Sequence, residues 1–193
     1  MAQELEIEYK NMLTSDQFNT LCRFFKLPSG SFFKQINDYF DTPTLALRAK
    51  HAALRIRHLP SIHDLTLKQP HEGVVLETHQ KLTDDESKEL IQFGVMPAGE
   101  VERQITALGI DVDKLIHLGQ LRTERCSFPY NGGELFLDHS FYLKKEDFEL
   151  EWEAVNRSTG SDPFDDLLRQ HHIERQPSIS KIARLYNAIK KVK

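Results

Sequence analysis

The chain opens with a segment in which charged and apolar residues alternate with a period of two. Its charged members are Glu4, Glu6, Glu8 and Lys10. Its apolar members are Leu5, Ile7 and Tyr9. Residues two apart point in nearly opposite directions on a helix, so only a strand places each set on one face. The sequence therefore predicts a strand whose row of charge faces either bulk water or a ligand.

Composition limits the classes of partner. The 193 residues can enclose one sizeable core. Lys and Arg number 25 against 29 Asp and Glu, so the net charge of −4 provides no overall attraction to nucleic acid or to an anionic membrane. Any anion must therefore be held by a local cluster of bases.

Cysteine usage and hydropathy indicate a compartment. Cys22 and Cys126 are far apart and have no spacing typical of zinc or redox sites, which favours a reducing cytoplasm. The first residues lack a basic region followed by an apolar stretch, and no apolar run approaches membrane-spanning length, so we expect neither secretion nor membrane insertion. The nine histidines lack a metal-ligand spacing and are interpreted as surface or packing residues.

Capping residues and hydrophobic periodicity predict a mixed chain. Helical segments are expected at 16–25, 45–48, 84–90, 100–108, 111–118, 162–171 and 180–190. Strands beyond the first are expected at 31–41, 53–59, 62–69, 74–82, 121–128, 134–143 and 148–155. The pattern predicts an α+β protein, a single domain over 1–193 with a helical insertion near 83–118. Its core is expected to be an eight-stranded antiparallel β-barrel, a tunnel with helices packed on its outside.

The predicted strands carry charges that are sorted by sign. Acids lie on the first strand and on the last, where Glu149, Glu151 and Glu153 share a face. Bases lie on strands between them, including Arg55 and Arg57. A charged strand face is usually solvated, and for any one strand that interpretation is preferred. The segregation by sign, the supply of helices to cover the apolar faces and the use of Arg favour a charged lumen instead.

Acids that face bases suit one type of ligand, a polyphosphate with a divalent metal ion. Carboxylate oxygens bind Mg²⁺ or Mn²⁺, while Arg and Lys neutralise phosphate oxygens. We therefore expect Mg²⁺ or Mn²⁺ as cofactor and a small molecule that contains a triphosphate as partner.

Several short motifs follow one another along the chain. They are Glu6-x-Glu8-x-Lys10, 39–43, 54–57, 66–68, Glu77, Arg125, Asp138, 149–151 and 180–181. In this order they resemble the motifs of the CYTH superfamily of triphosphate tunnel metalloenzymes, which includes class IV adenylate cyclases and thiamine triphosphatases. The resemblance covers essentially the whole chain and is greatest to the small YjbK-type bacterial subgroup.

The chemistry and the resemblance together imply roles for the charged residues. The metal ligands are expected to be Glu6, Glu8, Glu149 and Glu151. Glu153 and Asp138 would bind a second metal or orient the bases, and Glu77 would pair with the lysines. The triphosphate would contact Lys10, Arg55, Arg57, Lys68, Arg125 and Lys181. Arg184, one helical turn after Lys181, either reaches the phosphates or is a solvated helix charge.

The resemblance implies hydrolysis, by in-line attack of a metal-positioned water on the terminal phosphorus. The resemblance leaves a class IV-like cyclase open, in which a ribose hydroxyl attacks the α-phosphorus of ATP. A non-catalytic polyphosphate-binding or nucleotide-binding module also stays open. The residues distinguish neither the organic group on the substrate nor a monomer from a homodimer.

Overall fold

The computed structural model describes residues 3–60, 62–155, 160–176 and 178–191. Residue contacts divide the chain into two compact units. The first unit comprises Met1–Glu6, Ile36–Leu121 and Leu185–Lys193, and the second comprises Ile7–Gln35 and Arg122–Arg184. The described strands form a nine-stranded sheet accompanied by helices, which confirms the α+β class. No helix in the described ranges is long and apolar enough to span a bilayer.

The opening strand is interrupted, and this accounts for nine strands where the sequence predicted eight. Strand β1 (Gln3–Glu6) ends before Ile7 and pairs antiparallel with β6, whereas β2 (Glu8–Leu13) pairs antiparallel with β9. In the strand order of the sheet, β1 is first and β2 is last. These two strands are consecutive in the sequence, and only Ile7 separates them. Glu6 consequently belongs to the first unit and Glu8 to the second.

The first unit contains the basic strands. The order is β1-β6-β5-β4-β3-β7, and β7 belongs to the second unit from Arg122 onward. The bounds are β3 (Phe33–Asp41), β4 (Ala53–His58), β5 (His63–His71), β6 (Val74–Leu82) and β7 (Ile116–Tyr130). The register places Arg55 opposite Thr66 and Lys68 opposite Glu77. Residues opposite each other share a face, so these polar side chains lie on one surface of the sheet.

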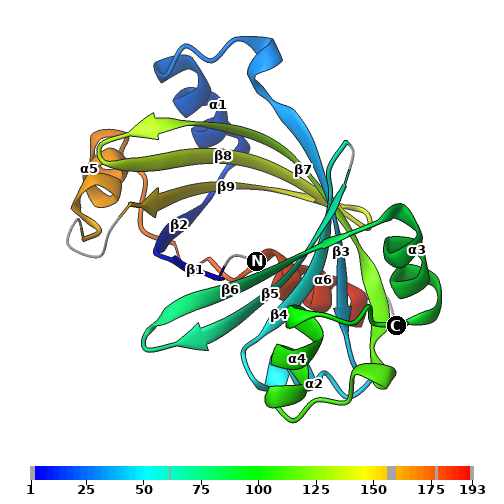
Figure 1. The fold of residues 1–193 in the computed structure, drawn as a ribbon. Helices are drawn as coiled ribbons and strands as arrows, with labels where there is room; N and C mark the ends of the chain where they lie inside the picture. The colour runs from blue at the N-terminus through cyan, green and yellow to red at the C-terminus, as the bar shows by residue number, and fades with distance from the viewer. Residues whose placement is uncertain (1–2, 61, 156–159, 177, 192–193) are drawn as a thin grey trace. The chain divides into compact units, whose positions relative to one another are not determined.

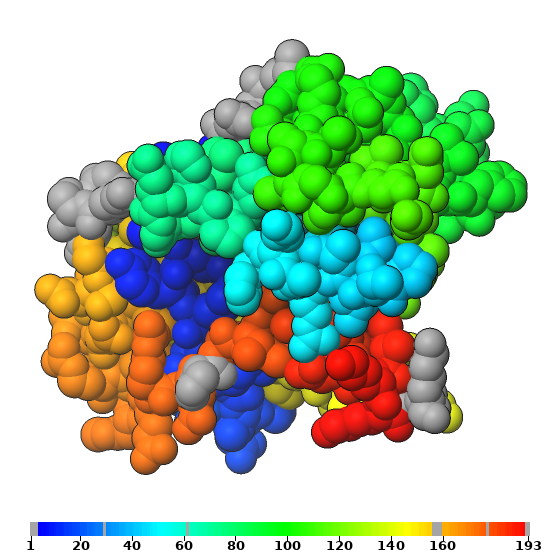
Figure 2. Space-filling view, turned by 90° about the horizontal axis from the view of Figure 1, so that it is seen from below, coloured from blue at the N-terminus to red at the C-terminus, as the bar shows by residue number. Residues whose placement is uncertain are grey.

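Helices cover the other, apolar face of the first unit. Leu54, Ile56, Leu65 and Leu67 are fully buried there in a core with α3 (Asp84–Phe93) and α4 (Glu100–Ala107). Figure 1 shows α4 beside β4 to β6, and Figure 2 shows the helical segments (green) gathered next to these strands (cyan and teal). The short helix α2 (Ala46–Ala49) follows β3.

The helical insertion is shorter than the sequence predicted. Thr83 caps α3, but the segment expected to be helical at 111–118 forms only a 3₁₀ turn, η2 (Val112–Lys114). Leu115 takes an extended backbone and is buried in the core, and β7 begins at Ile116. His117 then contacts Asp38 on β3, at 2.7 Å between Nε2 and Oδ1. Burial of Leu115 and this contact therefore favour a strand over another helical turn.

The second unit contains the acidic strands in the order β7-β8-β9-β2. The bounds are β8 (Gly133–Tyr142) and β9 (Lys145–Ala154), and β9 starts three residues before the expected Phe148. Trp152 is fully buried in a core with α1 (Ser15–Phe24) and α5 (Asp162–Gln170). The final helix α6 (Lys181–Lys190) contributes its first turn to the second unit and the rest to the first.

A buried carboxylate fixes the turn after β3. Oδ1 of Asp41 accepts backbone N–H groups from Thr42 at 2.7 Å and Leu47 at 2.8 Å, and Oδ2 accepts Arg48 N–H at 3.0 Å. Tyr186 on α6 donates its hydroxyl to the same carboxylate, and Asp41 is 0% exposed. Asp41 therefore fixes the turn that follows β3, and it also anchors α6.

Replacing Asp41 with Ala should lower the free energy of unfolding by about 3 kcal/mol or more, because four donors lose their acceptor at a buried position. Urea denaturation measures this. The control is Asp85→Ala, whose side chain is 92% exposed in an i,i+3 ion pair and should change stability by less than about 0.5 kcal/mol. Equal effects of the two substitutions would contradict the role of Asp41.

Candidate active site

Three buried carboxylates meet on the polar face of the second unit. Asp138 on β8 lies opposite Glu149 on β9, and Glu151 is two residues further along β9 on the same face. One oxygen from each lies within 4.8 Å of the others, and the residues are only 0%, 1% and 5% exposed. These three acids are therefore removed from bulk water, unlike the acids of a solvated strand face.

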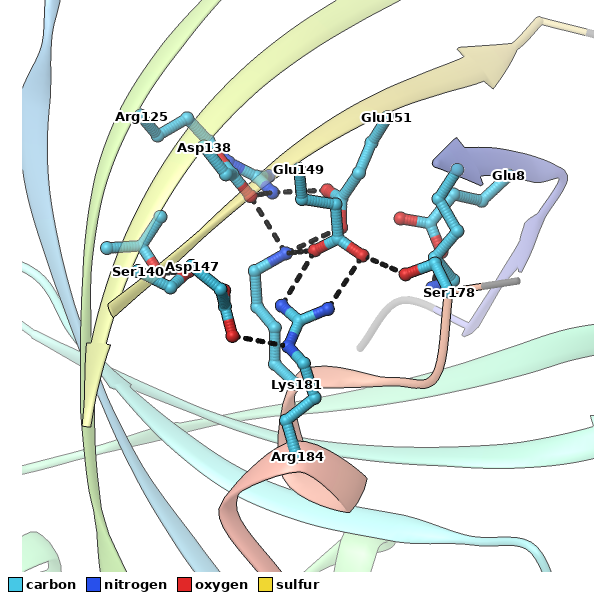
Figure 3. A network of polar contacts seen from close by, with 12 residues as sticks. Glu8, Arg125, Asp138, Ser140, Asp147, Glu149, Glu151, Ser178, Lys181 and Arg184 are labelled. Atoms are coloured by element: carbon cyan, nitrogen blue, oxygen red, sulfur yellow. Dashed lines mark hydrogen bonds and ion pairs between the residues drawn. The ribbon is translucent and has the colours of Figure 1, made fainter. Parts of the chain in front are cut away.

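The ammonium of Lys181 lies among these three carboxylates, as Figure 3 shows. Its Nζ is 2.8 Å from Asp138 Oδ2, 2.6 Å from Glu149 Oε2 and 2.5 Å from Glu151 Oε1. Burial alone would lower the pKa of Lys181, but the three negative charges raise it well above its usual value. Burial alone would raise the pKa of Glu151, but Lys181 and Arg125 hold it well below its usual range. Lys181 and Glu151 are therefore both charged.

Two arginines complete this cluster. Arg125 on β7 holds Asp138 with two hydrogen bonds, of 2.7 Å from Nε and 2.5 Å from a terminal nitrogen, and it also contacts Glu151. Arg184 holds both oxygens of Glu149 at 2.9 Å and is 7% exposed. The alternative of a solvated helix charge is thus wrong for Arg184. Each carboxylate of the cluster has at least two cationic groups around it.

Strand β2 adds an acid and a base to the same face. Lys10 lies opposite Glu151, and its Nζ is 2.6 Å from Glu8 Oε2. Burial would lower the pKa of Lys10, but the charges of Glu8 and Glu151 raise it. Glu153 lies opposite Glu8 and is exposed. Within the opening segment, Glu8 and Lys10 therefore lie beside the last strand.

The remaining acid of the opening motif lies in the first unit, within a row of alternating charges. Nζ of Lys68 lies 2.7 Å from Glu6 Oε2 and 2.5 Å from Glu77 Oε1. His79 continues the row, with Nε2 3.3 Å from Glu77 and Nδ1 3.0 Å from Asp64. Glu77 thus pairs with a lysine, as the sequence analysis expected.

The carboxylates around His79 perturb its titration. The hydrogen bonds to Asp64 and Glu77 raise the pKa of His79 to about 9. Burial would raise the pKa of Glu77, but His79 and Lys68 hold it well below its usual range. His79 is therefore an imidazolium at neutral pH and adds a positive charge to this face.

The two arginines of β4 lie on this same polar face. Arg57 donates from Nε to Asn37 Oδ1 at 3.3 Å. Nε of Arg55 is buried and has no hydrogen-bond acceptor within the described ranges. A buried donor without an acceptor is costly, so this position favours an oxyanion.

Some residues around these sites were not predicted from the sequence. His79 shares the strand face of Glu77 and could have been found by its two-residue spacing. Ser178, which hydrogen-bonds Glu149, lies in a loop without a recognisable pattern. Asp147 precedes Glu149 by two residues, and burial raises its pKa beside Arg184.

Comparison with known proteins places the chain in a family. The CYTH domain model matches residues 4–186, a span that contains every residue assigned a role from the sequence. The chain belongs to the CYTH domain family. The resemblance drawn from the motifs is thereby confirmed.

Individual CYTH relatives match this chain along almost its whole length. A Bacillus subtilis (strain 168) protein named "Putative triphosphatase YjbK" is 43% identical over 191 residues, covering 99% of each chain. A Bacillus halodurans crystal structure, described as a "putative adenylate cyclase", is 37% identical with a TM-score of 0.91, covering 95% of this chain and 98% of that one. A Hippeastrum structure, described as a "putative adenylyl cyclase" with dominant triphosphatase activity, is 21% identical with a TM-score of 0.75 over 96% of each chain, and shows the fold alone.

The perturbed pKa of His79 predicts a pH dependence of stability. The folded-state pKa of about 9 exceeds the ordinary value of 6.5, so the stabilisation is complete below pH 6.5 and is lost as the pH rises to about 9. The side chain is 24% exposed, and allowing for solvent screening we expect a loss on the order of 2 kcal/mol.

Urea denaturation of the wild type and His79→Gln at about pH 6 and about pH 9.5 measures this loss. The free energy of unfolding of His79→Gln should not show this decrease between the two pH values. His71→Gln, at an exposed position of β5, should show the same decrease as the wild type. The same pH dependence in His79→Gln as in the wild type would contradict the ion pairing of His79.

Proposed function

We propose that this CYTH protein is a metal-dependent triphosphatase that hydrolyses inorganic triphosphate or a small organic triphosphate. The observation that carries the proposal is the buried cluster of Asp138, Glu149 and Glu151 surrounded by Lys181, Arg125 and Arg184. A Bacillus subtilis relative at 43% identity is named as a putative triphosphatase, which supports the same activity.

The three clustered carboxylates fit a hard divalent cation. They offer oxygen donors within 4.8 Å of one another, and Mg²⁺ and Mn²⁺ prefer such ligands. We assign Asp138, Glu149 and Glu151 to the metal, with Glu6, Glu8 and Glu153 as further candidate ligands. When bound, the ion would neutralise phosphate charge and position water for attack.

The basic residues would hold the phosphate oxygens. The proposed set is Lys10, Arg55, Arg57, Lys68, Arg125, Lys181 and Arg184. Arg55 has a buried Nε without an acceptor among the described residues, and an oxyanion would satisfy it. Arg125, Lys181 and Arg184 contact carboxylates, so a divalent cation at the acids would free their positive charge for phosphate.

The reaction proposed is in-line attack of water on the terminal phosphorus, with pyrophosphate leaving when the substrate is inorganic triphosphate. Charge develops on the phosphate oxygens, and the fixed guanidinium and ammonium groups would stabilise it. No side-chain nucleophile is required. Arg125 is held in place by Asp138 and Glu151, so it needs little reorganisation as the charge develops.

A second candidate function is cyclisation of ATP. A Bacillus halodurans relative at 37% identity is described as a putative adenylate cyclase, which supports this alternative. The same charged residues would serve both reactions. Hydrolysis and cyclisation differ in which phosphorus is attacked, so their products distinguish them.

Phosphate release from tripolyphosphate should require Mg²⁺ or Mn²⁺ and should fall about 100-fold or more in Glu151→Gln, because this substitution removes one charge from the metal cluster. A colorimetric phosphate assay, with parallel detection of cyclic AMP from ATP, measures both candidate reactions. The control is Glu146→Gln on β9, whose side chain is 59% exposed.

Unchanged turnover in Glu151→Gln, or turnover without a divalent cation, would contradict the metal assignment. Ligand-induced thermal stabilisation without phosphate release would favour a non-catalytic binding module. Cyclic AMP and pyrophosphate as the main products from ATP would favour the cyclase.

A further inference from the structure

A pair of histidines at the β4–β5 turn lies outside the charged faces already described. His58 and His63 are opposite each other and share the helix-covered side of the sheet with Ile56 and Leu65. Their Nδ1 atoms are 3.1 Å apart, and their side chains are 26% and 16% exposed. Both rings are thus partly accessible to solvent and direct a nitrogen toward each other.

The other nitrogen of each ring is held by a carboxylate. Nε2 of His58 lies 2.5 Å from Asp38 Oδ2, and Nε2 of His63 lies 3.1 Å from Asp84 Oδ1. Asp38 is 2% exposed, and His117 contacts its second oxygen at 2.7 Å. A carboxylate oxygen lies at each Nε2 atom, so the two Nδ1 atoms are left to each other.

The two Nδ1 atoms are 3.1 Å apart. A metal ion between them would bind both rings through these nitrogens.

The geometry also suits a metal ion. Bonds of about 2.0–2.1 Å to one ion place two imidazole nitrogens roughly 3.0–3.4 Å apart. The ring centroids are 4.7 Å apart and the ring planes are inclined at 78°. This centroid distance is too short for the two Nδ1 atoms to lie on the line that joins the centroids, so the two rings meet at an angle, as two ligands of one ion do. Histidine ligands commonly donate the second ring N–H to a carboxylate, which fixes the tautomer.

We propose that His58 and His63 form a binding site for a borderline-soft divalent transition-metal ion such as Zn²⁺, Ni²⁺ or Cu²⁺. The two Nδ1 atoms are the ligands, water completes the coordination, and Asp38 and Asp84 orient the rings. Two nitrogen donors favour these ions over Mg²⁺. The site therefore differs in chemistry from the oxygen-donor cluster of the second unit.

Electron paramagnetic resonance of the full-length protein with one equivalent of Cu²⁺ tests the site. The expected spectrum shows coupling to two imidazole nitrogens, and Zn²⁺ should displace the copper. His63→Gln should lose this spectrum, whereas His71→Gln, an exposed histidine on the same strand, should retain it. A two-nitrogen spectrum that persists in His63→Gln, or a wild-type spectrum with oxygen ligands alone, would overturn the proposal.

Asp84→Asn supplies an independent test, because it changes no ligand. The Asp84 side chain is 73% exposed, and the capping box of α3 uses Thr83 and Glu86 instead, so the fold should persist. Loss of the carboxylate partner of His63 should weaken Zn²⁺ binding, measured by calorimetry, about 10–100-fold. Unchanged affinity would contradict the orienting role of Asp84 in the proposed site.

Discussion

The structure of the second unit depends on one buried ion cluster, in which Lys181, Arg125 and Arg184 together neutralise Asp138, Glu149 and Glu151. Taking a carboxylate out of water costs several kcal/mol unless it is paired and hydrogen-bonded. Each of these acids contacts Lys181 at 2.5–2.8 Å, and Arg125 or Arg184 supplies further donors. Each acid of the cluster therefore has cationic partners at a position that is at most 5% exposed.

The pairing of acids with bases is consistent with the alternation of apolar and charged residues along the strands. Trp152 and Leu150 fill the face of β9 that α1 and α5 cover, and Glu149 and Glu151 lie on the other face. The same division holds in the first unit, where Leu54 and Ile56 face the helical core and Arg55 and Arg57 face away from it. The apolar faces provide burial, and the polar faces are available for a ligand.

Much of this organisation could be predicted from the sequence. Period-two alternation identified the charged faces, and capping signals identified α1 and α3, because these depend on neighbouring residues. The interruption at Ile7 could not be predicted, since it arises from pairing of β1 and β2 with strands far along the chain. The start of β7 at Ile116 also depends on distant contacts, including that of His117 with Asp38. The expected site residues were all charged side chains, whereas Ser178 reaches Glu149 through its position in a loop.

The central claim is that the three carboxylates can bind a divalent cation in place of the Lys181 ammonium. Thermal unfolding of Lys181→Met with and without Mn²⁺, in the absence of phosphate, tests it most directly. Without metal the variant should melt below the wild type, because buried carboxylates lose a cation. Mn²⁺ should then raise the melting temperature of the variant more than that of the wild type. An equal or smaller shift in the variant would contradict the claim.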